Sequence, residues 1–300
     1  MNKKNIENWI ILIILSITWG SSFILMKKSL ESFNYLEVAS LRLVIAFLVL
    51  CPLLFYSFRK LTKSHIIPLL IISIIGTVIP AIIFAYSIEQ NLNSSVAGML
   101  NALTPIFTFI IGLTIFHKNA WKKENIIGII IGLLGTYLLL YPFDAGLEIK
   151  LSLLIMGATI CYAISINTIK DCLNTLNPVD IAVLSSFFSV IIPLFYILYN
   201  VIINGHSTHT TNTLEKIQAN ISQFYYLVVL GAVCTSAAIL LFNYLIKRSN
   251  ALFASSTTYL IPIFAIIWGL LDGEDIVKTE IIGVIIILIG VFIMNSKRVY

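Results

Sequence analysis

The stretches NALTPIFTFIIG (residues 101–112) and TYLIPIFAIIWG (258–269) decide how this chain is organised. They share six of twelve residues at a constant offset of 157. A second match follows each stretch, because IIGIIIGLLG from Ile126 pairs with IIGVIIILIG from Ile281 at an offset of 155. Self-similarity at a fixed distance is typical of a duplicated unit. The sequence therefore predicts two related halves that meet near Leu147.

The composition predicts that lipid is the main solvent of this chain. Of its 300 residues, 59% are hydrophobic and 11% are charged, and the mean hydropathy is +0.98. Soluble domains carry about 25% charged residues. The net charge of +5 is interpreted as a cytoplasmic-loop bias rather than a nucleic-acid surface. The four cysteines are scattered singly, so no metal site, disulfide framework or cofactor is expected.

Apolar runs between polar breaks are long enough to cross a membrane. A crossing helix needs about 20 mostly apolar residues, and only helices satisfy a lipid-exposed backbone. We therefore expect an all-α polytopic membrane protein with ten transmembrane helices. The first run has no small-residue cleavage site and is interpreted as a retained helix rather than a signal peptide. The expected spans cover residues 9–27, 36–58, 66–88, 94–116, 124–141, 150–169, 179–201, 223–246, 250–270 and 279–296.

Basic residues predict the orientation of these spans. With the N-terminus inside, 13 of the 19 Lys and Arg residues fall in inner segments and five in outer ones, while Arg42 lies within a span. Cytoplasmic loops carry the excess of basic residues, so both termini are expected in the cytoplasm of a multi-pass protein of the cell (inner) membrane. The polar loop 202–222 is then extracytoplasmic.

The duplication predicts two inverted repeats, residues 9–141 and 150–297, with five spans each. Because five is odd, equivalent helices cross the membrane in opposite directions. Inverted repeats are typical of secondary transporters, in which two similar halves exchange conformations around a central site.

Several motifs carry a resemblance to a known family. They are the WGSSF of residues 19–23 with Lys27 after it, Leu41-Arg42-Leu43, and the Pro-Gly-Gly pattern that closes each half. Because these motifs occur in this order, the chain resembles the EamA-type branch of the drug/metabolite transporter superfamily over nearly its whole length. The resemblance implies that the first, third and fourth helices of each half surround the cavity. It also implies a Glu after the ninth span, which Glu274 fits, whereas Phe116-His117-Lys118 departs from the pattern in the first half.

Two cations lie inside or at the edge of spans. Arg42 either faces a cavity or an adjoining helix end, or extends to the outer headgroups. Lys27 shares a helix face with Trp19 and Phe23, so it either holds a substrate carboxylate or phosphate or extends to the headgroups.

Uncharged polar residues and prolines complete the candidate site. Gly20 is expected to let a neighbouring helix pack closely. Pro105 and Pro262 are expected to break helices and to serve in gating, because proline frees a backbone carbonyl. The candidate substrate-binding residues are Trp19, Ser22, Lys27, Arg42, Tyr86, Asn101, Thr104, Tyr162, Asn243, Thr258 and Tyr259.

Together these features predict a secondary, alternating-access transporter that exports or exchanges small amphipathic metabolites such as amino acids. The alternatives are a carrier of anionic metabolites, such as sugar phosphates or nucleotide-linked compounds, and a non-transporting receptor or scaffold. An enzyme is not expected, since no H-E-x-x-H metal pair occurs and all four histidines lie in loops or at span ends. The expected partners are a small-molecule substrate and the lipid bilayer, without nucleic acid. A monomer and a homodimer both stay open.

Overall fold

A computed structural model describes residues 3–117, 123–139, 147–204, 213–249 and 251–295. All its regular elements in these ranges are helical, so the predicted all-α class is confirmed. In chain order they are α1 (Lys3–Leu30), α2 (Tyr35–Leu50), η1 (Cys51–Leu53), α3 (Leu54–Phe58), α4 (Lys63–Leu70), η2 (Ile71–Val78), α5 (Ile79–Glu89), α6 (Ser94–Leu100), η3 (Asn101–Leu103), α7 (Thr104–Thr114), α8 (Lys123–Leu139), α9 (Leu147–Cys172), α10 (Pro178–Asn204), α11 (Thr213–Ala219), α12 (Ile221–Gly231), η4 (Ala232–Ala237), α13 (Ala238–Arg248), α14 (Ala251–Ser255), η5 (Ser256–Tyr259), α15 (Ile261–Leu271) and α16 (Lys278–Asn295).

Eight helical segments of the described chain are long and apolar enough to cross a membrane. They match predicted spans one to four and six to nine, and Ile126–Leu138 is a shorter apolar helix within α8. The eight segments are Ile6–Leu30, Tyr35–Phe58, Lys63–Glu89, Ser94–Thr114, Glu148–Cys172, Pro178–Ile202, Ile221–Arg248 and Phe253–Leu271. The predicted fifth and tenth spans correspond to α8 and α16. The count of ten crossings stays a prediction.

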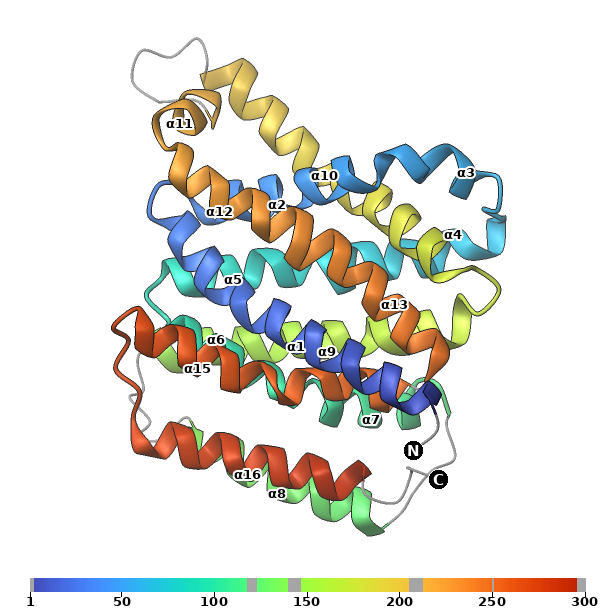
Figure 1. Ribbon diagram of the computed structural model, residues 1–300, viewed down its shortest axis with the longest axis vertical. Helices are drawn as coiled ribbons and strands as arrows, with labels where there is room; N and C mark the ends of the chain where they lie inside the picture. Colours follow the sequence, from blue (N-terminus) through green and yellow to red (C-terminus); the bar gives the residue numbers. More distant parts are fainter. Residues whose placement is uncertain (1–2, 118–122, 140–146, 205–212, 250, 296–300) are drawn as a thin grey trace.

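The helices form one bundle in which α8 and α16 pair at an edge (Figure 1). A Cβ added at Gly290 would lie 2.6 Å from the carbonyl oxygen of Gly128, and one at Gly135 would lie 2.7 Å from that of Gly283. Only glycine lets two helix backbones approach so closely. The glycines of the IIGIIIGLLG and IIGVIIILIG stretches therefore form the contact between α8 and α16.

Two of the spans contain π-helical segments. In η2 the hydroxyl of Thr77 donates to the carbonyl of Ile72 at 3.0 Å, and in η4 the hydroxyl of Thr235 donates to the carbonyl of Leu230 at 2.8 Å. Each bond reaches back five residues, which matches the wider turn of a π-helix. These turns shift the side chains of the following helix relative to a regular α-helix, and π-bulges are common at functional sites.

Three other spans contain short 3₁₀ segments, namely η1 in the second span, η3 in the fourth and η5 in the ninth. Both η3 and η5 precede a proline in the first turn of the next helix, Pro105 in α7 and Pro262 in α15. Proline has no N–H for a regular bond and is tolerated in a first turn. The predicted helix breaks at these prolines are therefore present, and their role in gating stays a prediction.

The start of α1 and the end of α16 lie at the same end of the bundle (Figure 1). We call it the terminal end. The α1–α2 and α5–α6 connections lie at the other end, which we call the opposite end.

Candidate functional site

A cavity lies inside the bundle, between α1, α2, α9, α10 and the interrupted third, fourth, eighth and ninth spans. The centres of water molecules can reach about 130 Å³ of it. None of its described lining residues comes from α8 or α16. Eight of the eleven candidate residues line it: Trp19, Ser22, Arg42, Asn101, Thr104, Tyr162, Asn243 and Thr258.

Arg42 brings a positive charge to the cavity wall. Its Nε donates to the hydroxyl of Thr235 at 2.7 Å, and that hydroxyl donates in turn to the carbonyl of Leu230. No carboxylate in the described ranges forms an ion pair with Arg42. The π-helical segment η4 thus holds the Nε edge of the guanidinium group at the cavity wall.

Aromatic rings form the apolar part of the wall. The indole N–H of Trp19 donates to the carbonyl of Cys234 at 3.1 Å, and its ring meets Phe242 edge to face at 4.8 Å. On another side Phe84 stacks on Tyr162 with ring centroids 6.0 Å apart. Such contacts fix the orientation of the rings. The cavity therefore combines rigid apolar surfaces with one cation.

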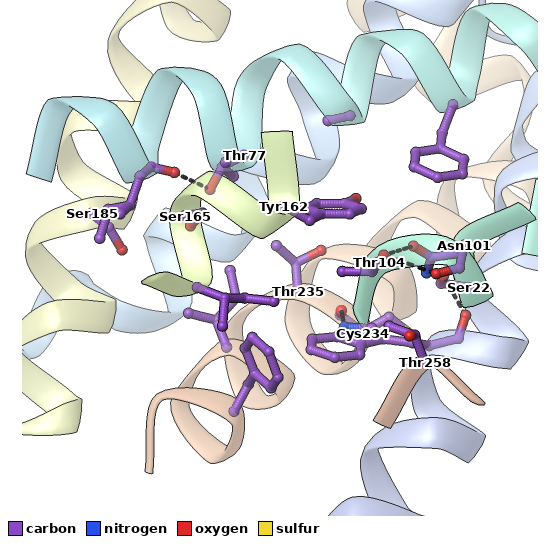
Figure 2. A pocket seen from close by; sticks show the side chains of 18 of the residues that line it. Ser22, Thr77, Asn101, Thr104, Tyr162, Ser165, Ser185, Cys234, Thr235 and Thr258 are labelled. Atoms are coloured by element: carbon purple, nitrogen blue, oxygen red, sulfur yellow. Dashed lines mark hydrogen bonds between the residues drawn. The ribbon is translucent and has the colours of Figure 1, made fainter. Parts of the chain in front are cut away.

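Hydroxyl and amide groups provide the uncharged polar contacts (Figure 2). Thr104 donates to the backbone carbonyl of Asn101 at 2.8 Å and to its amide oxygen at 3.1 Å. Ser22 donates to the carbonyl of Trp19 at 2.6 Å, and Thr258 to that of Ser255 at 2.9 Å. These hydroxyl protons bond to the helices' own carbonyls, so the hydroxyl oxygens stay available as acceptors.

Three candidate residues lie outside the cavity lining. Lys27 forms ion pairs with Asp272 at 2.7 Å and with Glu274 at 2.8 Å near the opposite end of the bundle. The ring of Tyr86 packs against that of Tyr35 with centroids 5.2 Å apart, and Tyr259 is partly buried against the apolar core. Pro105 and Pro262 are not among the described lining residues either, but they directly follow η3 and η5, which contribute Asn101 and Thr258.

Sequence reasoning missed several cavity residues, which are Thr77, Phe84, Ser165, Ser185, Thr235 and Phe242. A signal for some of them exists in the repeat. Thr77 and Phe84 of the third span match Thr235 and Phe242 of the eighth at an offset of 158. Aligning these two spans, and not only the fourth with the ninth, would have identified four of the six.

A cluster of charges joins α1, α6 and the segment after α15. Besides Lys27, Glu274 accepts hydrogen bonds from the backbone N–H and the hydroxyl of both Ser94 and Ser95, at 2.6–3.1 Å. Burial alone would raise the pKa of Glu274, but the hydrogen bonds from Lys27, Ser95 and Ser94 outweigh it and lower the pKa to about 2. Burial would also raise the pKa of Asp272, but the hydrogen bonds from Lys27 and Lys28 outweigh it and lower this pKa. The cluster is therefore ionised at neutral pH.

The described residues contain no group of three or more His, Cys, Asp or Glu side chains that could hold a metal ion. His206 and His209, two histidines of the polar loop 202–222, lie outside the described residues.

Comparison with known proteins agrees with the fold and the duplication. A protein of solved crystal structure superposes with a TM-score of 0.65 over 98% of this chain and 99% of its own, at 14% identity, which shows a shared fold. An uncharacterized transporter of Archaeoglobus fulgidus is 24% identical over 97% of this chain and 100% of its own length. A probable amino-acid metabolite efflux pump of Salmonella typhimurium is 22% identical over 94% of this chain and 92% of its own.

The family comparison covers nearly the whole chain. Residues 8–141 and residues 149–296 each match the EamA-like transporter family. The resemblance seen in the residues is thereby confirmed, and the named relatives are transporters. The chain belongs to the EamA-like transporter family.

Proposed function

We propose that this protein is a secondary transporter that exports or exchanges small amphipathic metabolites, such as amino acids, through the central cavity. The observation that carries the proposal is the cavity wall itself. It joins aromatic rings, hydroxyls and the single guanidinium of Arg42, and both halves of the chain contribute to it. Ligand sites of small molecules have this make-up, with mostly apolar walls and a few polar groups. The name of the Salmonella relative, a probable amino-acid metabolite efflux pump, agrees with this substrate class.

We further propose that the chain is an inverted repeat of five plus five spans that works by alternating access. Each half has one span with a π-helical segment, η2 or η4, and one with a 3₁₀ segment before a proline. The occurrence of the same helix interruptions in corresponding spans supports two halves with the same architecture. Broken helices near the middle of the membrane are where transporters of this kind form their sites.

The proposed location is the cell membrane, with both termini in the cytoplasm. The excess of basic residues in the inner segments supports this orientation. The start of α1 and the end of α16 at one end of the bundle are consistent with it.

Counterflow in proteoliposomes tests the transport function. Vesicles loaded with a mixture of amino acids are tested for uptake of each labelled amino acid in turn, with phosphate esters added as competitors. We expect uptake of one group of amino acids, reduced about tenfold by Asn101→Ala or Thr104→Ala, since one lost polar contact corresponds to about that factor. Thr114→Ala is the matched control, because Thr114 makes a similar bond at the exposed end of α7.

Two results would contradict the proposal. Absence of counterflow by folded protein would remove the transport function. Strong competition by phosphate esters, without uptake of any amino acid, would favour the carrier of anionic metabolites instead.

A further inference from the structure

The two halves line the cavity with matched residues. Residues of the first and sixth spans correspond at an offset of 143, and those of the third and eighth at 158. Both members of several such pairs face the cavity: Trp19 and Tyr162, Ser22 and Ser165, Phe84 and Phe242. The wall is therefore similar on its two sides in shape and polarity.

Arg42 departs from this matching. Its counterpart at an offset of 143 is Ser185, which also lines the cavity. Packing supports the correspondence. Ser73 donates to the carbonyl of Ser185 at 2.9 Å, and a Cβ at Gly231, the counterpart of Ser73, would lie 2.8 Å from the carbonyl of Arg42. The same contact between the two halves thus occurs twice, once at Arg42 with its guanidinium group and once at Ser185 with its hydroxyl.

The charge of Arg42 has no counterpart elsewhere in the wall. The lining residues of the described chain include no other Lys or Arg and no Asp, Glu or His. Figure 2 shows hydroxyl-bearing residues around the cavity, among them Thr77, Ser165 and Ser185. An arginine stays protonated in proteins, and away from water its charge is costly unless an anion pairs with it. A bound anion would supply that missing partner.

We infer that Arg42 determines the charge specificity of the transporter: the cavity takes small molecules that carry one carboxylate on an apolar body and excludes cations. This inference deepens the proposed function and rests on it. The bond from Nε to Thr235 orients the guanidinium plane, so its terminal nitrogens can donate two parallel bonds to a carboxylate. The aromatic rings contact the apolar body, and the hydroxyl oxygens of the wall accept hydrogen bonds from a further polar group, such as the ammonium of an amino acid.

Charge balance sets the limits of this class. One guanidinium neutralises one negative charge, so a phosphate dianion would keep a second charge without a partner in the low-dielectric cavity. A molecule whose only charge is an ammonium group meets no carboxylate among the described lining residues and is repelled by Arg42. A molecule with one carboxylate, either a monoanion or an amino-acid zwitterion, is therefore favoured over both a dianion and a cation.

A set of four probes of one shape tests the inference: 3-phenylpropionate, its carboxamide, 3-phenylpropylamine and phenyl phosphate. Each competes with the labelled substrate found by counterflow, and each is also tested for thermal stabilisation of the purified protein. We expect the carboxylate to act at a concentration at least about tenfold lower than the amide and the phosphate, with no effect of the amine. In Arg42→Gln the carboxylate and the amide become equal within about twofold, whereas Arg42→Lys keeps the charge but loses the two parallel bonds, and so keeps only part of the preference. Arg59→Gln is the matched control, because Arg59 is exposed and lies outside the cavity lining, and it keeps the wild-type order of potency.

Three results overturn the inference: equal potency of acid and amide on the wild-type protein, a stronger effect of the amine or phosphate, or an unchanged acid-to-amide ratio in Arg42→Gln. The order of potency of the four probes on the wild-type protein tests the inferred preference for a carboxylate even where Arg42→Gln does not fold. Failure of the proposed function is a separate outcome. If the folded wild-type protein shows no counterflow, the thermal stabilisation still reports whether the cavity prefers the carboxylate.

Discussion

Glu274→Gln removes one negative charge and leaves the shape of the side chain almost unchanged. The carboxylate is 2% exposed and accepts five hydrogen bonds, one from Lys27 and four from Ser94 and Ser95. A fall in pKa from 4.5 to about 2 corresponds to about 3 kcal/mol at 1.36 kcal/mol per pKa unit. Lys27 is 34% exposed, so solvent screens part of this energy and we expect a loss of about 2 kcal/mol.

Thermal unfolding in detergent measures this loss. At about 2–4 °C per kcal/mol for chains of 150–250 residues, Glu274→Gln should lower Tm by about 4–8 °C. The matched control is Glu31→Gln. Glu31 pairs with Lys28 at 3.2 Å, but both side chains are exposed, by 48% and 33%, so its removal should change the free energy of unfolding by less than about 1 kcal/mol.

The pH dependence gives an independent check. The pKa of Glu274 is lower in the folded protein than in the unfolded chain, so the unfolded chain binds more protons between the two values. The stabilisation is complete above about pH 4.5 and is lost as the pH falls toward about 2. The Tm difference between wild type and Glu274→Gln should thus be constant from pH 5 to 8 and shrink in acid. Equal Tm values at pH 7, or a difference that grows in acid, would refute this reasoning.

Two further predictions concern packing and orientation. Gly290→Ala should destabilise the contact between α8 and α16 by about 1–3 kcal/mol, because the new methyl group would meet backbone atoms of Gly128. Gly157→Ala has no atom within 4 Å of its Cβ and should raise Tm slightly; a lower Tm for it than for Gly290→Ala would contradict the packing argument. In a variant with Cys172 as its sole cysteine, an impermeant maleimide should label this exposed thiol in inverted vesicles and not in intact cells. Labelling in intact cells alone would reverse the proposed orientation.

Most of the span pattern could be predicted from hydropathy, because crossing a bilayer needs a long apolar helix. The predicted spans 36–58 and 66–88 correspond to Tyr35–Phe58 and Lys63–Glu89 within a few residues. The expected close packing at Gly20 is also confirmed, since a Cβ there would lie 2.5 Å from that of Phe264. Hydropathy did not reveal the π-helical segments, because the hydrogen bond of Thr77 to Ile72 leaves the apolar pattern of the span unchanged.

Partners distant in sequence limited the prediction of the site. The sequence placed Lys27 on the helix face of Trp19, but in the structure Lys27 pairs with carboxylates about 245 residues further along, at Asp272 and Glu274. A helical wheel cannot show which distant loop returns to that face. The surroundings of Arg42 were easier to predict from the sequence. A charged residue within an apolar span has few environments open to it, and the structure puts Arg42 in the cavity wall beside Thr235.

The repeat suggests a more general way to find such a site from sequence. In a protein built from two inverted halves, a cavity on the axis between them must be lined by equivalent positions of both. Cavity residues should then occur as pairs at a fixed offset, as Thr77 and Thr235 do. Pairs that keep the same chemistry, such as Ser22 and Ser165, make the wall similar on its two sides. The pair of Arg42 and Ser185 differs in charge, and the specificity proposed for Arg42 rests on that difference.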